Sequence, residues 1–193
     1  MLNDPIVLVV VDALNAEKIP FLVAGSLSSN VYGVPRSTKD ADFVIELGSA
    51  SVTSLRTHLP SHYHLDPQIQ FESVTATLRN IIRVEGSAFK VELFRLSTDP
   101  HDQERFRRRI STKVEGRMIY LPTAEDVVVM KLRWGRELKR PKDLDDLRNV
   151  ILLQQVTLDW DYVYEWCDRH ETRELLDEIR REIAGSGNVG GLP

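Results

Sequence analysis

The residues with the clearest chemical meaning are two aspartates one position apart, Asp40 and Asp42. The apolar residues 43–45 follow them, so the segment 40–47 is predicted to be a β-strand. Residues i and i+2 of a strand point to the same face, and the two carboxylates are therefore expected side by side. Adjacent carboxylates repel each other unless a cation lies between them. Hard oxygen ligands of this kind suit Mg²⁺, which completes its shell with substrate phosphates, so the pair predicts a magnesium site.

A phosphate site is predicted from Gly25 and Ser26, which directly follow the apolar run 21–24. The run is typical of a buried strand, and the Gly-Ser pair then opens a short helix, closed by Gly33 in the C′ position. Unpaired N–H groups at a helix N-terminus, together with a serine hydroxyl, suit a phosphate. Arg36, in the loop that follows, could reach the phosphate or pair with an acid.

A third carboxylate is required if two metal ions assist phosphoryl transfer. The segments 81–84 and 89–94 alternate polar and apolar residues around a turn at 85–87, which predicts a β-hairpin. Glu92 lies in the middle of its second strand and is the candidate, either as a metal ligand or as the group that takes the acceptor proton. The alternative is an exposed glutamate on an edge strand.

The elements around these residues predict an α/β (α+β) fold. The segment 3–16 contains many β-branched residues, but Asp4-Pro5 is typical of a helix start, so a helix is favoured. The other expected elements are helical segments at 49–58 and 102–109, a short strand at 62–65, an ambiguous segment at 70–78, a hairpin at 112–121, and helices at 123–138, 141–154, 159–169 and 171–184.

This order of elements predicts a catalytic domain with a mixed sheet over residues 1–121. A C-terminal helical region is expected over 122–185, and the glycine-rich residues 186–193 predict a flexible tail. Lys131 would lie on the first helix of that region and Asp143 near the start of the next. A helical hairpin could place both over a cleft that contains the predicted metal and phosphate sites, where a lysine would neutralise triphosphate charge. The alternative is a solvated lysine.

The composition is that of an ordinary globular protein, with 193 residues, 42% hydrophobic and 28% charged, and a net charge of −4. The acidic balance argues against binding nucleic acid through bulk charge. A single cysteine, Cys167, excludes an intramolecular disulfide and fits a reducing compartment. The apolar run 6–11 lacks the features of a signal peptide and is too short to span a bilayer. We therefore expect a cytoplasmic protein with no membrane partner.

Together, these motifs resemble the DNA polymerase β-like nucleotidyltransferase superfamily. Gly25-Ser26 is followed, after thirteen residues, by Asp40-Ala41-Asp42. Arg36 and Thr38 match the family's Arg-X-Thr-X-Asp-X-Asp segment. Within the superfamily, the chain looks most like the minimal nucleotidyltransferases and the abortive-infection toxin nucleotidyltransferases.

Further similar blocks extend the resemblance over about residues 20–150. Residues 125–131 are similar to the family's Asp-Leu-X-X-X-Lys segment, with Asp126 and Lys131 at the matching positions. Residues 140–146 are similar to its Arg-X-Lys-Asp-X-X-Asp segment, which contains Asp143 and Asp146.

The resemblance implies a Mg²⁺-dependent enzyme, with two metal ions, that moves a nucleotidyl group from an NTP to a hydroxyl and releases pyrophosphate. The residues implied are Asp40, Asp42, Glu92 and Lys131 as catalytic, the first three of them as metal ligands, and Gly25, Ser26, Arg36, Thr38 and Asp143 for the nucleotide.

Three acceptors are open, and the long helical tail with its Lys131 and Asp143 segments favours the first, an RNA. A toxin of a toxin–antitoxin or abortive-infection system would modify RNA such as a tRNA 3′ end, and a basic cluster would hold it, comprising Arg105, Arg107, Arg108, Arg109 and Lys113. A minimal enzyme would instead AMPylate a protein hydroxyl, and a cognate toxin or antitoxin would then be a partner. The third acceptor is a small molecule. The rival from another class is a non-catalytic nucleotide-binding module of the same fold.

Overall fold

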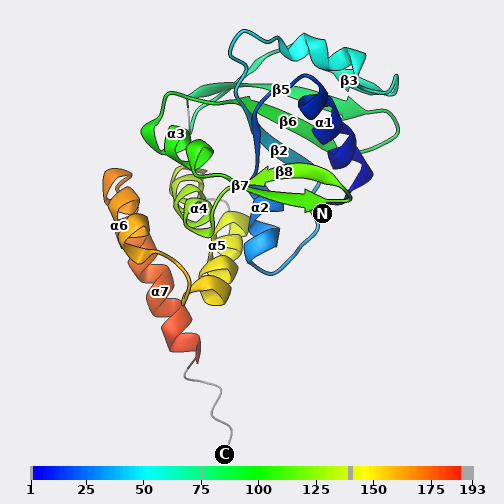
Figure 1. Ribbon diagram of the computed structural model, residues 1–193. Coiled ribbons are helices and arrows are strands. Elements are labelled where there is room, and N and C mark those ends of the chain that lie inside the picture. The colour runs from blue at the N-terminus through cyan, green and yellow to red at the C-terminus, as the bar shows by residue number, and fades with distance from the viewer. Residues whose placement is uncertain (1, 75, 139–140, 188–193) are drawn as a thin grey trace, which may run out of the picture. The chain divides into compact units, whose positions relative to one another are not determined.

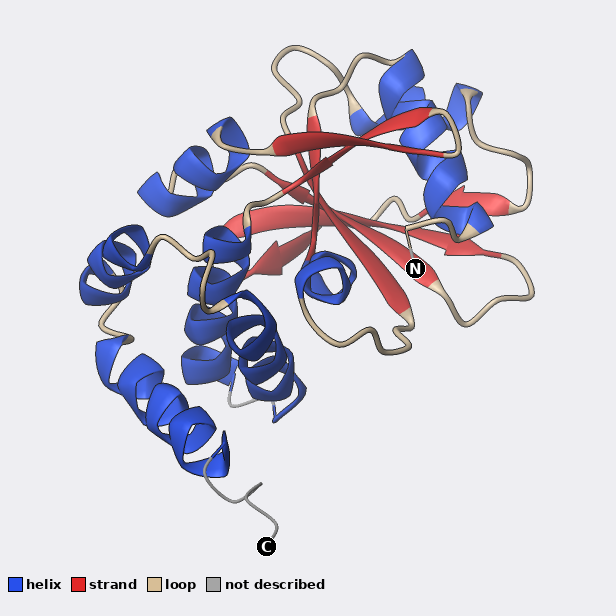
Figure 2. Ribbon diagram, turned by 60° about the horizontal axis from the view of Figure 1, so that its bottom comes forward, coloured by secondary structure: helices blue, strands red, loops and turns tan. Residues whose placement is uncertain are grey.

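The chain is described by a computed structural model over residues 2–74, 76–138 and 141–187, and it divides into two compact units. Unit 1 comprises residues 1–28 and 36–123, and unit 2 comprises residues 29–35 and 124–193. Unit 1 carries the strands, whereas the described part of unit 2 is helical (Figure 2). That residues 1–121 act as a catalytic domain stays a prediction.

The elements follow in this order: α1 (Pro5–Ala16), β1 (Phe21–Ala24), α2 (Gly25–Tyr32), β2 (Asp40–Ile45), the 3₁₀ helix η1 (Val52–Thr57), β3 (Tyr63–Leu65), β4 (Gln70–Glu72), β5 (Thr77–Val84), β6 (Lys90–Arg95), α3 (Pro100–Arg107), β7 (Ile110–Val114), β8 (Arg117–Leu121), α4 (Ala124–Leu138), α5 (Pro141–Gln154), α6 (Trp160–Arg169) and α7 (Arg173–Gly187). The helix preferred for the first segment is confirmed, with Asp4 accepting a hydrogen bond from the Ile6 N–H at 2.8 Å. The ambiguous segment 70–78 forms β4 and the start of β5.

The sheet of unit 1 is mixed, as expected. In the described residues it has the strand order β1-β2-β6-β5-β3, with β4 also paired to β5 (Figure 1). Strands β2 and β6 are parallel, and the other pairs are antiparallel. Both predicted hairpins are confirmed, as β5–β6 and β7–β8. At the tip of β7–β8, Glu115 and Gly116 both have positive φ, as a two-residue type I′ turn requires.

The alternation along β2 separates a core face from a polar face. Ala41, Phe43 and Ile45 are buried in one apolar cluster with residues of α1, such as Val10 and Leu14. The intervening carboxylates at 40 and 42 are therefore held on the other face of a strand whose position is fixed by the core.

Helix α2 ends as predicted at Tyr32, but the expected left-handed conformation of Gly33 is wrong. Gly33 is not among the residues with positive φ. A Cβ at this position would lie 3.2 Å from Val150 Cγ2 and 3.3 Å from Asn149 Cβ, so the glycine is explained by close packing against α5.

Unit 2 has its own apolar core, made by α4 to α7 and including the fully buried Cys167. Exposed ion pairs lie on these helices, for example between Arg173 and Asp168 at 2.7 Å.

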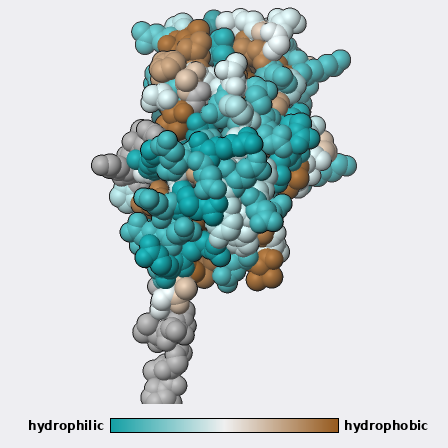
Figure 3. Space-filling view, turned by 90° about the vertical axis from the view of Figure 1, so that its left-hand side faces the viewer, coloured by the Kyte–Doolittle hydropathy of each residue, from teal (hydrophilic) through white to brown (hydrophobic). Residues whose placement is uncertain are grey.

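The face of the molecule shown in Figure 3 is largely hydrophilic. None of the described helices combines the length and apolar character needed to cross a bilayer. Of the predicted flexible tail, 186–187 belong to α7, and 188–193 lie outside the described residues.

Candidate active site

The glycine of the Gly-Ser pair lies directly against the second aspartate. Strand β1 runs antiparallel to β2 with Ala24 opposite Asp42, so the chain enters α2 at Gly25 beside that carboxylate. Gly25 has a φ of +59°, and a Cβ on it would lie 1.9 Å from Asp42 Oδ2. Only glycine allows this approach, which places the first residues of α2 next to the carboxylate.

The loop before β2 contacts both the carboxylate of Asp40 and the predicted phosphate-binding residue Ser26. Thr38 Oγ1 donates a hydrogen bond to Asp40 Oδ1 at 2.6 Å, which fixes that carboxylate. Arg36 Nη2 donates to Ser26 Oγ at 2.8 Å, which places the guanidinium beside the predicted phosphate-binding residues. The structure thus brings together Ser26, Arg36, Thr38 and Asp40 as the sequence predicts.

Glu92 lies on β6, a central strand of the sheet, and is 4% exposed, so the alternative of an exposed edge-strand residue is wrong. Asp42 and Glu92 are direct partners in the parallel β2–β6 pair, and Asp40 is the partner of Lys90. Laterally paired residues point to the same face, so the three predicted carboxylates share one polar face of the sheet.

Glu92 does not, however, present free oxygens to that face. Lys90 Nζ donates to its Oε1, and Arg79 Nη1 donates to its Oε2 at 2.7 Å. Among the described residues, no three His, Cys, Asp or Glu side chains are gathered so that they could hold a metal ion. Glu92 is thus placed where the sequence predicts, but it is bound by two cations of the chain.

The donor set nonetheless fits one hard divalent cation. Asp40 and Asp42 are half-buried carboxylates on one face of β2, next to the N-terminal turn of α2. Carboxylates plus substrate phosphates are the ligands that Mg²⁺ takes in nucleotide sites. These two residues would hold the ion, which would neutralise phosphate charge as an NTP reacts.

Sequence reasoning missed Arg79 and Gln70, because the Arg79–Glu92 contact depends on the register of β5 against β6 and the Arg79–Gln70 contact on that of β4 against β5. The sequence reveals neither register. Lys90 could have been found, since it lies two positions before Glu92 on one strand and so on the same face.

In unit 2, Lys131 contacts the two aspartates of α5 that the family segment contains. Its Nζ lies 2.7 Å from Asp143 Oδ1 and 2.8 Å from Asp146 Oδ2, and all three side chains are at most 8% exposed. Asp143 Oδ2 is buried and has no hydrogen-bond partner among the described residues. Asp126, also fully buried, accepts a hydrogen bond from the Tyr162 hydroxyl at 2.6 Å. Arg140, the first residue of the second family segment, lies outside the described residues.

The predicted basic cluster makes mostly internal contacts. Arg105 is 6% exposed and is paired with Asp102. Arg107 pairs with Glu104 at 2.6 Å, and the Arg109 guanidinium lies 4.2 Å from the centre of the Phe106 ring. Arg105 is therefore removed from solvent, whereas Arg107 and Lys113 are exposed.

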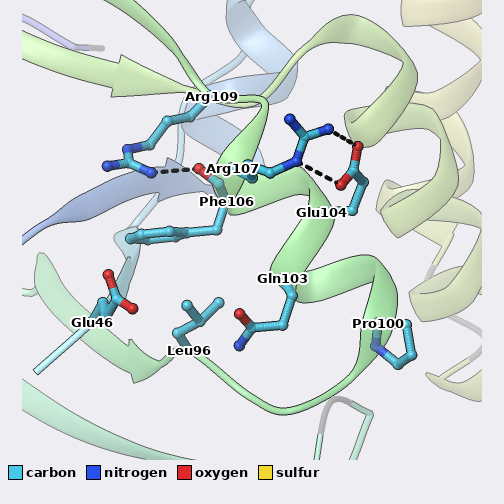
Figure 4. A pocket seen from close by; sticks show the side chains of 8 residues that line it. All are labelled: Glu46, Leu96, Pro100, Gln103, Glu104, Phe106, Arg107 and Arg109. Carbon is cyan, nitrogen blue, oxygen red and sulfur yellow. Dashed lines mark hydrogen bonds and ion pairs between the residues drawn. The ribbon is translucent and has the colours of Figure 1, made fainter. Parts of the chain in front are cut away.

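Two of those arginines line an open hollow of about 400 Å³ beside α3 (Figure 4). Its lining residues are Glu46, Leu96, Pro100, Gln103, Glu104, Phe106, Arg107 and Arg109. Glu46 directly follows the end of β2, and Asp40 is the first residue of that strand. The hollow is therefore at the opposite end of β2 from Asp40, about 20 Å away at the rise of an extended strand.

No protein-family model and no curated protein sequence matches this chain. Solved structures do match. The chain is similar to ANT(2″)-Ia, solved in complex with adenylyl-2″-tobramycin, with a TM-score of 0.60 and 10% identity over 88% of this chain and 97% of that one. It is also similar to an antigenic nucleotidyltransferase-like protein from Paracoccidioides brasiliensis, with a TM-score of 0.57 and 17% identity over 90% and 89%.

A third similar structure is a protein from Thermotoga maritima provisionally assigned as a nucleotidyltransferase, with a TM-score of 0.51 and 18% identity over 69% of this chain and 85% of that one. The chain thus has the nucleotidyltransferase fold, which confirms the predicted fold class. The closer resemblance to abortive-infection toxins stays a prediction.

Proposed function

We propose that this protein is a Mg²⁺-dependent nucleotidyltransferase that moves a nucleotidyl group from an NTP to a hydroxyl and releases pyrophosphate. The observation that carries the proposal is the contact of Gly25 with Asp42 at the start of α2. This contact joins a phosphate-binding helix terminus to a pair of metal-binding carboxylates, and nucleotidyl transfer needs both.

The residues of unit 1 supply positioning and charge. The N–H groups at the start of α2, the Ser26 hydroxyl and the Arg36 guanidinium would bind the triphosphate, because all are donors on one short segment. The acceptor oxygen forms a bond to the α-phosphorus, and the bond from that phosphorus to the bridging oxygen of the β-phosphate breaks. Pyrophosphate leaves with the electron pair, and Glu92 would accept the hydroxyl proton. Such chemistry depends on positioning and electrostatics.

The acceptor is a hydroxyl compound of one of three classes. RNA, in a toxin–antitoxin setting, is the acceptor that the sequence favours, but Arg105, Arg107 and Arg109 are engaged in internal contacts. The likeness to ANT(2″)-Ia, solved in complex with adenylyl-2″-tobramycin, supports a small-molecule acceptor. The remaining class is a protein hydroxyl.

The acceptor class can be identified by incubating the protein with NTPs labelled at the α-phosphate and with separated RNA, protein and small-molecule fractions of a lysate. The fraction that carries the label contains the acceptor.

The test of the activity is the Asp42→Asn variant. We expect pyrophosphate release with Mg²⁺ and NTP to fall by at least about 10²-fold, because one charge-stabilising group in such a site contributes roughly 3 kcal/mol to the transition state. The matched control is Asp12→Asn, an exposed aspartate on α1 that pairs with Arg117. Circular dichroism should show that both variants are folded.

Asp42→Asn turning over NTP at the rate of Asp12→Asn would contradict the assignment. A wild-type protein that binds Mg²⁺-NTP in calorimetry but releases no pyrophosphate with any acceptor fraction would instead be a nucleotide-binding module of the same fold.

A further inference from the structure

We propose that the outer edge of β7 binds the same edge of a second copy of this chain, so that two β7–β8 hairpins form one antiparallel sheet with the strand order β8-β7-β7-β8. In this pairing, Ser111 of each copy lies opposite Lys113 of the other. Association through β7 is independent of the proposed nucleotidyl transfer and adds a binding surface to the chain.

The backbone groups of β7 that face away from β8 are those of Ser111 and Lys113. A two-residue turn joins the strands, so its flanking residues Val114 and Arg117 form a hydrogen-bonded pair, and such pairs alternate along an antiparallel ladder. Within the described part of the chain, β7 pairs only with β8 (Figure 1). Both outward-facing residues are exposed, so their N–H and C=O groups can accept a further strand.

The opposite edge of the hairpin is covered, which leaves β7 as the accessible side. Asn15 of α1 donates a hydrogen bond from its Nδ2 to the Met118 carbonyl of β8 at 3.4 Å. In the larger sheet, β3 and β4 have three residues each, and β1 has four, all buried. Strand β7 has five residues, none of them proline and three of them exposed. Edge strands are usually kept short or interrupted, so an accessible edge of this length points to a partner strand.

Charge distinguishes between the possible registers of two β7 strands. A two-fold antiparallel pair joins outward-facing residues to each other, and the arrangements that pair most of the strand are centred on position 111, 112 or 113. Centring on Lys113 places two lysines opposite each other, and centring on Ser111 places Lys113 opposite Arg109 of the second copy. Like charges directly opposite are destabilising. Centring on Thr112 places Lys113 opposite Ser111 and avoids both contacts.

The same register covers the exposed apolar side chain of the strand. Ile110 is 47% exposed and lies on the same face of β7 as Thr112 and Val114. Centring on Thr112 sets Ile110 opposite Val114 of the second copy and Thr112 opposite itself, and side-chain pairs of this kind stabilise a sheet. Each Ser111 would exchange both backbone hydrogen bonds with the Lys113 opposite. Backbone, charge and apolar contacts thus favour one register.

The experiment measures association of the full chain by sedimentation equilibrium from micromolar to millimolar concentrations, because one short strand pair buries less surface than the interface of a tight dimer. Ser111→Pro removes an outward-facing N–H, and Ser111→Ala, which keeps it, is the matched control. Ser111→Glu and Ser111→Lys test the register by changing the charge opposite Lys113. Circular dichroism should show that the variants are folded.

We expect a monomer–dimer equilibrium in the wild type and in Ser111→Ala, with a dimer at least about tenfold weaker in Ser111→Pro because each copy loses a hydrogen bond. Ser111→Glu should tighten the dimer by about 2- to 30-fold, since two opposite-charge pairs form, and Ser111→Lys should weaken it by a similar factor. Both changes should shrink at high salt.

A wild type that is monomeric up to millimolar concentration, or a folded Ser111→Pro that dimerises as strongly as Ser111→Ala, would overturn the proposal. If Ser111→Pro is not folded, the opposite effects of the two charged variants decide. Weakening in both of them would place the centre of the pair at position 111, and tightening in Ser111→Lys alone would place it at 113, where Ser111 meets Glu115. Either result would overturn the register, and none of these outcomes bears on the proposed function.

Discussion

Gly25 combines a left-handed backbone conformation with close approach to the candidate metal ligand Asp42. Its φ of +59° disfavours any side chain, and a Cβ would overlap Asp42 Oδ2 at 1.9 Å. We expect Gly25→Ala to lose about 1–2 kcal/mol of unfolding free energy, because alanine is strained in the left-handed conformation. The added Cβ should also displace Asp42. Because Asp42 would leave its position, pyrophosphate release should fall as far as in Asp42→Asn, even where the variant is folded.

A matched control separates these two effects. Gly48 has a similar φ of +52°, but a Cβ there would meet nothing within 4 Å. Gly48→Ala should therefore show a comparable loss in a urea unfolding midpoint with unchanged pyrophosphate release. Equal activity in the two alanine variants would show that the contact between Gly25 and Asp42 is not needed.

At this scale, residue type and spacing correctly predicted that Asp40 and Asp42 lie side by side on one strand and that Glu92 lies on a neighbouring strand, because the strand period of two is a local rule. Their roles as metal ligands stay predictions. The contacts of Glu92 were not predictable in the same way. Arg79 reaches it from another strand, and only the β5–β6 register brings the two together. A candidate ligand can be found in a sequence, whereas the cations that occupy it depend on tertiary structure.

Among the elements, helices α4 and α5 are joined by a buried ion cluster. Lys131 of α4 contacts Asp143 and Asp146 of α5, and Lys131→Met would remove the cation that these two buried carboxylates share. We expect the variant to lose about 3–5 kcal/mol of unfolding free energy, the usual cost of breaking a buried ion pair. The three tryptophans, at 134, 160 and 166, all belong to unit 2, so tryptophan fluorescence in urea reports on this unit.

The control for that substitution is Lys142→Met, since Lys142 is exposed on the same helix pair and should change stability by less than about 0.5 kcal/mol. The measurement also bears on the predicted phosphate role of Lys131. A Lys131→Met protein with unchanged stability and a raised KM for NTP would favour that role over the structural one.

The element boundaries were largely predictable, because caps, hairpin turns and proline positions act locally. The end of α2 was the exception. Gly33 was expected to adopt the left-handed conformation that ends a helix. A glycine is instead required there by close packing against residues of α5, which are far away in the sequence. Packing constraints of this kind have no local signal.

For the molecule as a whole, buried ionisable groups of unit 2 link stability to pH. Two weak acids of unit 2 have raised pKa values. Burial raises the pKa of the Cys167 thiol from 9.0 to about 11. Burial, together with the nearby Glu125 and Asp126, raises the pKa of the Tyr32 hydroxyl from 10.0 to about 12. In both cases the folded unit favours the protonated, neutral form.

The sign of the pH dependence follows from these directions. The unfolded chain releases the Cys167 proton near pH 9, whereas the folded unit retains it up to about pH 11, so the stability contributed by this group is complete below pH 9 and is lost as the pH rises through that interval. Each unit of pKa difference corresponds to about 1.4 kcal/mol, so the shift of about two units predicts a loss on the order of 3 kcal/mol. Urea unfolding followed by tryptophan fluorescence, under reducing conditions at several pH values, measures it in unit 2. Cys167→Ala should flatten the slope between about pH 9 and 10 and leave only the fall due to Tyr32 from about pH 10 upward, whereas an identical slope in the two proteins would show that the thiol is not the group responsible.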